Sequence, residues 1–149
     1  MNWIPDGYPG EGNLILFNNF VNGEWQSAVY ELSTPLNESN TYDLNSNSTY
    51  GPEEPIWMYI GDFFAWIQSG AFRLPNGNTI ITVATAARIF EVSGEPPSII
   101  WDYEFNTNNF GLVQKSDIFP NRDSILFLGD SFTQGQGARP WIDNFKGEI

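Results

Sequence analysis

The sequence contains no histidine and no cysteine among its 149 residues. Without imidazole, no side chain has an unperturbed pKa near neutrality, so histidine-dependent triads and histidine-ligated zinc are excluded within this chain. Without thiols, disulfides, thiolate nucleophiles and thiolate metal sites are excluded as well. Any chemistry of this chain therefore depends on carboxylates, hydroxyls and six basic side chains.

Basic residues are also scarce, since 6 lysines and arginines stand against 18 aspartates and glutamates, for a net charge of −12. Such a chain repels phosphates, so we expect neither nucleic acid nor an anionic membrane as a partner. No apolar run approaches the roughly 18 residues of a membrane helix. The first residues, "MNWIPDGYPGEG", lack the basic start and apolar run of a secretory signal.

Helical periodicity is almost absent, and short apolar runs rich in β-branched and aromatic residues take its place. Glycine, proline, asparagine and serine separate these runs, as they separate strands. An apolar content of 41% with 16% aromatic residues predicts a packed core. We therefore predict an all-β protein with strands in the runs "NLILFNN", "SAVYEL", "PIWMYI", "GAFRL", "NTIITVA", "RIFEV", "SIIWDYEF" and "SILFLGD".

The runs recur in a fixed order. "GNLILFNN", "VYEL" and "PIWMY" are followed by "GNTIITVA", "IFEV" and "IIWDY", and a third, weaker copy begins at "FPNRDSILFLGD". The motifs "LPN" and "FPN" lie 45 residues apart, a spacing typical of a propeller blade. We predict one domain over 1–149, a partial β-propeller of about three four-stranded antiparallel blades, with repeats at about 12–59, 70–103 and 115–149 and a polar excursion at 33–54.

Two features of the first two repeats are specific enough to test. The turn "PNGN" joins "GAFRL" to "NTIITVA", and Gly77 is expected to supply the positive φ that a tight hairpin needs. Trp57 and Trp101 occupy matching places in the first two repeats. Because repeated aromatics usually serve repeated packing, both are predicted to lie between neighbouring blades.

Several segments together resemble the bacterial arylsulfotransferase (aryl-sulfate sulfotransferase) family of β-propellers. They are "WIPDGYPGEGNLILFNN", "YGPEEPIWMY", "SGAFRLPNGNTIITVATAARIFEV" and "IIWDYEF". The resemblance implies transfer of a sulfuryl group between phenolic compounds through a sulfated histidine, with no cofactor and in a periplasmic or extracellular location. The ligand that it implies is a small aromatic sulfate ester or a phenol.

The chain departs from that family at two points. It has no histidine, so no nucleophile is carried over, and its three repeats are fewer than the four or more blades of a closed propeller. We expect a fragment that is inactive alone, completed by the remaining blades of a parent protein that hold the histidines. A non-catalytic binding or scaffold module is the alternative.

Anion binding requires cations or preorganised donors. Arg73 and Arg88 flank the strands expected near the propeller channel, so they are predicted to bind the substrate; the other interpretation is pairing with surplus acids. Asp43, Glu53 and Glu54 could bind calcium, but no calcium-loop spacing is present, so no metal site is predicted.

A further resemblance points to a different class. "SILFLGDSFTQGQGA", residues 124–138, resembles the first block of the GDSL or SGNH esterases, which would make Ser131 the nucleophile. Such an enzyme needs a later Asp-x-x-His, and none follows here. Because the same stretch aligns with "LPNGNTIITVAT" at the blade period, the third repeat is preferred over a truncated hydrolase.

Overall fold

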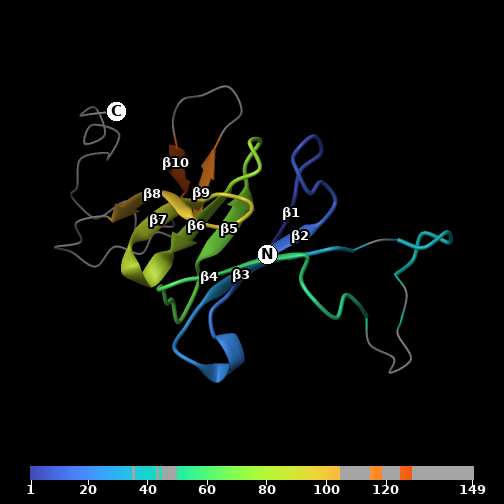
Figure 1. Ribbon diagram of the computed structural model, residues 1–149, viewed down its shortest axis with the longest axis horizontal. Helices are drawn as coiled ribbons and strands as arrows, with labels where there is room; N and C mark the ends of the chain where they lie inside the picture. Colours follow the sequence, from blue (N-terminus) through green and yellow to red (C-terminus); the bar gives the residue numbers. More distant parts are fainter. Residues whose placement is uncertain (35, 43, 45–49, 105–114, 119–124, 129–149) are drawn as a thin grey trace.

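The computed structural model describes residues 1–34, 36–42, 44 and 50–104, together with the backbone of 115–118 and 125–128. Within this part the chain forms strands and two single-turn 3-10 segments and no α-helix, which confirms the predicted all-β class. Among the described residues no helix is both long and apolar enough to cross a bilayer. The strands form two four-stranded antiparallel sheets and one two-stranded sheet (Figure 1).

The first sheet has the strand order β1-β2-β3-β4. A 3-10 turn, η1 (Val21–Gly23), connects β2 to β3, and residues 33–56 connect β3 to β4. The described residues of this second connection extend away from both sheets (Figure 1). The strands are β1 (Asn2–Trp3), β2 (Leu14–Asn18), β3 (Ala28–Leu32) and β4 (Trp57–Ile60).

The second sheet has the equivalent order, β5-β6-β7-β8. The "PNGN" turn connects β5 to β6 as predicted: the Leu74 amide donates to the Asn78 carbonyl at 2.8 Å, and Gly77 has a φ of 89°. A 3-10 turn, η2 (Ala84–Ala86), connects β6 to β7. The strands are β5 (Gly70–Arg73), β6 (Thr79–Val83), β7 (Arg88–Val92) and β8 (Ile99–Glu104).

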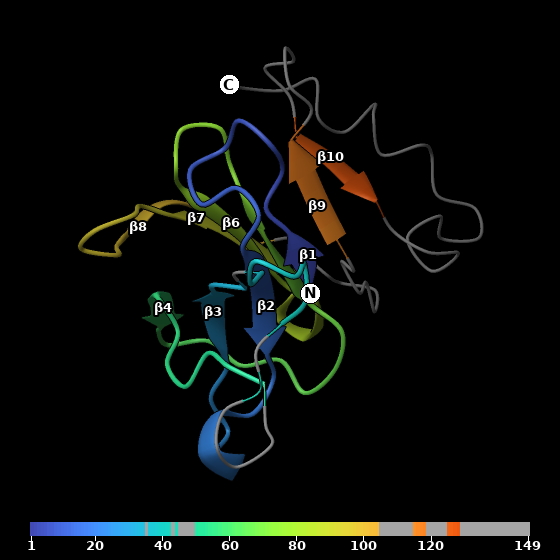
Figure 2. The ribbon, with the colours of Figure 1, turned by 90° about the vertical axis from the view of Figure 1, so that its right-hand side faces the viewer.

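The two-stranded sheet pairs β9 (Lys115–Ile118) with β10 (Ile125–Leu128). β9 begins 45 residues after β5, at the spacing found in the sequence. It lies against β6 (Figure 2), and β5 likewise lies against β2. The three sheets therefore follow one another in series, and they do not close into a ring.

The two larger sheets share a register as well as an order. In the first, Ile15 pairs with Glu31 and Glu31 with Trp57. In the second, Ile80 pairs with Glu91 and Glu91 with Trp101. Because directly paired residues of antiparallel strands project from the same face, each sheet carries a row of isoleucine, glutamate and tryptophan on one face.

The main core lies between the two sheets. The Trp57 side chain is only 7% exposed, and its indole Nε1–H donates to the Gly94 carbonyl at 2.9 Å, so the prediction that it packs between neighbouring sheets is confirmed. The buried residues of this core come from both sheets and from the β4–β5 connection: Ile4, Ile15, Val29, Trp57, Phe63, Ala65, Ala71, Ile81, Val83, Phe90 and Val92.

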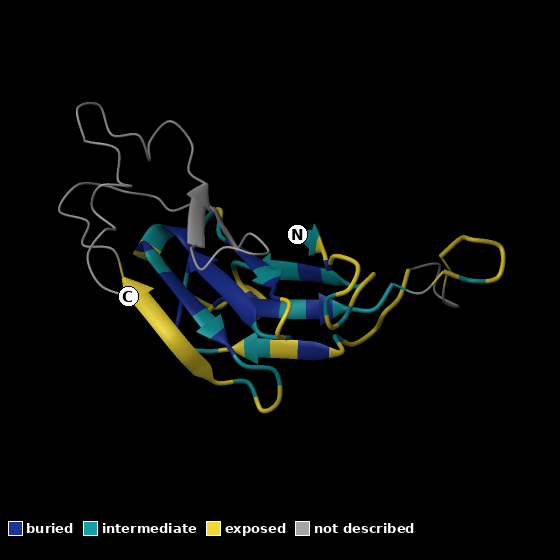
Figure 3. Ribbon diagram, turned by 90° about the horizontal axis from the view of Figure 1, so that it is seen from above, coloured by how far each residue is buried: buried dark blue, intermediate teal, exposed yellow. Residues whose placement is uncertain are grey.

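Trp101 does not have the environment predicted for it. It is 37% exposed and stacks on Tyr103, with ring centroids 6.2 Å apart. All six residues of β8 are exposed, and the strand forms the outer edge of its sheet (Figure 3). The difference arises because burial of a tryptophan in this row requires a neighbouring sheet over it. The second sheet, β5-β6-β7-β8, covers Trp57 on β4 in this way, whereas Trp101 lies on β8, whose residues are all exposed.

Candidate functional site

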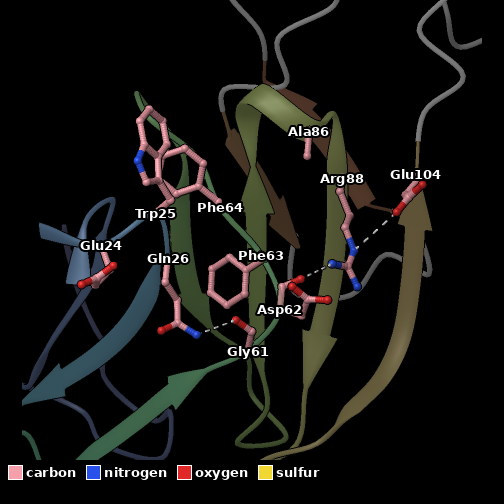
Figure 4. Close-up of a pocket in the computed structure, with 10 residues that line it drawn as sticks. All are labelled: Glu24, Trp25, Gln26, Gly61, Asp62, Phe63, Phe64, Ala86, Arg88 and Glu104. Atoms are coloured by element: carbon pink, nitrogen blue, oxygen red, sulfur yellow. Dashed lines mark hydrogen bonds and ion pairs between the residues drawn. The ribbon is translucent and has the colours of Figure 1, made fainter. Parts of the chain in front are cut away.

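A groove of about 590 Å³ lies between the two larger sheets, at one end of the core (Figure 4). The loop between η1 and β3 forms one side, the residues after β4 form the floor, and β7 with the end of β8 forms the other side. The lining residues are Glu24, Trp25, Gln26, Gly61, Asp62, Phe63, Phe64, Ala86, Arg88 and Glu104.

Aromatic rings form one wall of the groove. Trp25 and Phe64 meet edge to face with centroids 5.0 Å apart, and Phe20 completes the cluster at 5.2 Å from Phe64. Trp25 is nevertheless 76% exposed. The tight η1 turn explains its position: Val21 is buried, its amide donates to the Gln26 carbonyl at 2.9 Å, and the residues between are directed outward. Clustered exposed aromatics of this kind are typical of binding surfaces.

Arg88, the first residue of β7, stands on the opposite side (Figure 4). Its Nε and Nη2 donate to the two Asp102 carboxylate oxygens at 2.9 and 2.6 Å, a bidentate pair. Its guanidinium carbon lies 4.7 Å from the centre of the Phe90 ring, and Nη1 donates to the Asp62 carbonyl at 3.4 Å. Arg88 therefore lines the groove as a substrate-binding residue would, and it is also paired with an acid.

The ion pair between Arg88 and Asp102 shifts the pKa values of both side chains. Hydrogen bonding to Asp102 raises the pKa of Arg88, and hydrogen bonding from Arg88 lowers the pKa of Asp102. Both groups are thus charged near neutrality and largely cancel one another. The carboxylates of Glu24, Asp62 and Glu104 also line the groove, so its lining is acidic overall. An anionic ligand would be repelled.

We expect Asp102→Asn to lower the free energy of unfolding by about 0.5–1 kcal/mol at pH 7, the range for a partly exposed pair. Because the folded pKa of Asp102 is depressed, its contribution is present above the ordinary value of 3.8 and is lost as the pH falls through the lower folded value. Urea denaturation at pH 7, 5, 4 and 3 checks this, with exposed Asp6→Asn as the control. A difference that persists unchanged at pH 3 would contradict an ionic origin.

Arg73, the other predicted substrate-binding residue, lies away from the groove. Its side chain is buried between the sheets, where Nη2 donates to Glu31 Oε2 and Nη1 donates to the Gly77 carbonyl at 2.8 Å. The guanidinium carbon lies 5.1 Å from the centre of the Trp57 ring. Burial lowers the pKa of Arg73, and the Glu31 carboxylate opposes that effect. This geometry places Arg73 in the packing between the sheets.

The remaining predicted residues contribute nothing to the groove. Ser131 and Asp43 lie outside the described residues. Glu53 and Glu54 are exposed in the connection before β4, and the described part of the chain holds no group of three or more acidic side chains that could bind a metal. Sequence reasoning missed Trp25 and its neighbours, and the one local signal was the Asn-Gly pair of "FVNGEW", which predicts a turn two residues before the tryptophan.

Comparison of this chain with known protein families, with curated proteins and with solved structures gave no match.

Proposed function

We propose that this chain is a non-catalytic binding module built from blades of a propeller like that of the aryl-sulfate sulfotransferases, and that its groove binds a small phenolic compound. The observation that carries the proposal is the aromatic wall formed by exposed Trp25 and half-buried Phe64, which faces Arg88 across an acidic groove (Figure 4).

The arrangement of the sheets supports the blade part of the proposal. Two four-stranded meanders have the same order and register, and each is followed by a strand that lies against the second strand of the preceding sheet. Four-stranded antiparallel sheets packed one after another are the building units of propellers. In a complete propeller further blades would continue the series beyond β9 and β10.

The charge of the groove distinguishes between the two ligands that the family resemblance implies. A sulfate ester carries a negative charge and would meet three carboxylates, while the Arg88 guanidinium is already neutralised by Asp102. A phenol is uncharged at neutral pH and can place its ring against Trp25. Its hydroxyl group can donate a hydrogen bond to a carboxylate or to the side-chain oxygen of Gln26. The groove therefore favours the phenol.

Binding without turnover is the expected behaviour of the chain itself. Sulfuryl transfer through an enzyme intermediate needs a nucleophile that is reactive near neutrality, and the chain contains no histidine. Serine, threonine and tyrosine would each need a base, and the carboxylates that could serve repel an anionic donor. In a parent propeller, blades that carry histidine would perform the transfer.

We expect calorimetric titration to show saturable binding of phenol and clearly weaker binding of phenyl sulfate. Trp25→Ala should weaken phenol binding about 3- to 10-fold, because an aromatic pair contributes about 0.5–1.5 kcal/mol beyond its buried area. Trp66→Ala is the matched control, since Trp66 is exposed and does not line the groove. Tighter binding of phenyl sulfate, or equal losses in the two variants, would refute the proposal.

A further inference from the structure

One arginine within this chain occupies a well-defined site on the preceding sheet. Arg73 contacts Glu31 through Nη2 and lies over the Trp57 ring. Glu31 is itself held in place by Asn13, whose Nδ2 donates to Glu31 Oε1 at 2.7 Å. The chain thereby shows how a carboxylate, a bracing asparagine and an indole on one sheet bind a guanidinium from the next strand.

The second sheet presents the same three residues in the same register. Glu91 pairs with Trp101 across β7 and β8, just as Glu31 pairs with Trp57 across β3 and β4. Asn78 Nδ2 donates to Glu91 Oε1 at 2.6 Å, which matches the bond from Asn13. The two asparagines also share a local sequence, because each follows a glycine and precedes the second strand of its sheet.

The second site lacks the arginine of the first and is more exposed than it. The residue of β9 at the strand position of Arg73 is Ile118, which has no charge. Among the described residues, Glu91 receives hydrogen bonds on Oε1 alone, so Oε2 accepts none. Trp101 is 37% exposed, whereas Trp57, beneath Arg73, is 7% exposed.

We propose that Glu91, Asn78 and Trp101 form a binding site for an arginine side chain of a partner polypeptide. The carboxylate oxygen Oε2 would accept from the guanidinium, and the indole would lie against its flat face, as Glu31 and Trp57 do with Arg73. A lysine fits less well, because it lacks the planar group that stacks on indole. The net charge of −12 also favours a basic partner.

The β5 sequence itself supplies the probe. A capped peptide Gly-Ala-Phe-Arg-Leu, copied from residues 70–74, is titrated into the ¹⁵N-labelled chain while the Trp101 indole N–H resonance, assigned with Trp101→Phe, is followed. We expect saturable shifts at Trp101. A peptide with citrulline in place of arginine should bind about tenfold more weakly or worse, since charged hydrogen bonds contribute about 1.5–3 kcal/mol. A lysine peptide keeps the charge but loses the planar group, so it should bind more weakly than the arginine peptide and more tightly than the citrulline peptide.

Glu91→Gln should reduce the affinity for the arginine peptide at least about tenfold for the same reason. Glu95→Gln, an exposed change in the β7–β8 connection, should leave it unchanged. If Glu91→Gln fails to fold, the comparison of arginine and citrulline peptides on the unaltered chain decides. Equal binding of the citrulline peptide, no shift at Trp101, or shifts at Trp57 or Trp25 instead would overturn the proposal. Self-association that Glu91→Gln abolishes would make the occupant a second copy and would likewise overturn it.

Discussion

Replacing Arg73 with methionine is expected to lower the free energy of unfolding by about 3–5 kcal/mol, the cost of breaking a buried ion pair. Methionine fills much of the space over Trp57, so the loss comes mainly from the Glu31 carboxylate, which is left buried without its cation. Urea denaturation at pH 7 measures the change. Arg88→Met is the control, because the Arg88 pair is more exposed and should contribute about 1 kcal/mol or less.

A double variant separates charge from packing. Glu31→Gln combined with Arg73→Met removes both charges, and the glutamine oxygen can still accept from Asn13. Buried ion pairs can be replaced by neutral residues at little cost, so the double variant should recover at least about 2 kcal/mol of the loss. A double variant as unstable as Arg73→Met alone would show that arginine packing, rather than the orphaned carboxylate, dominates.

Phe90→Ala is expected to destabilise the protein by about 3–5 kcal/mol, the range for removing a buried phenylalanine. Phe90 is fully buried, and its ring meets Phe63 edge to face at 5.3 Å and Tyr59 at 6.0 Å. Its removal leaves a cavity where the two sheets meet, below the Arg88 guanidinium.

Thermal and urea unfolding of this variant are compared with those of Phe20→Ala. Phe20 is 41% exposed at the rim of the groove, so its loss should cost no more than about 1.5 kcal/mol. Similar losses for both variants would mean that the space between the sheets is less closely packed than the contacts of Phe90 indicate.

Local features of the sequence predicted the strands well. The period-two runs and their glycine and asparagine boundaries depend on neighbouring residues, and the hairpin at Gly77 formed where its turn chemistry required it. Trp57 and Trp101 show the limit of this reasoning. Both have a similar local sequence, "IWMY" and "IWDY", but the burial of each depends on the sheet that lies over it, which is a non-local property.

Contacts between residues far apart in the sequence also limited the prediction of the groove. Arg73 and Arg88 were both predicted to bind substrate, yet only Arg88 lines the groove. The partner of Arg73 is Glu31, 42 residues away, and no local pattern connects them. Trp25 meets Phe64 only because β3 and β4 return the chain to the same end of the sheet, so their cluster became visible only in three dimensions.

The position of Arg73 on β5 has a consequence for how this chain folds and comes apart. The first sheet buries Glu31 and depends on the second sheet for the compensating cation, Arg73. The two sheets therefore cannot unfold separately without leaving the Glu31 carboxylate unpaired. In a linear array of units with nearest-neighbour coupling, this makes the first junction cooperative. Ile118 offers no such cation at the next junction. The strand position that Arg73 occupies therefore couples the first two sheets by charge, and the same position of β9 does not.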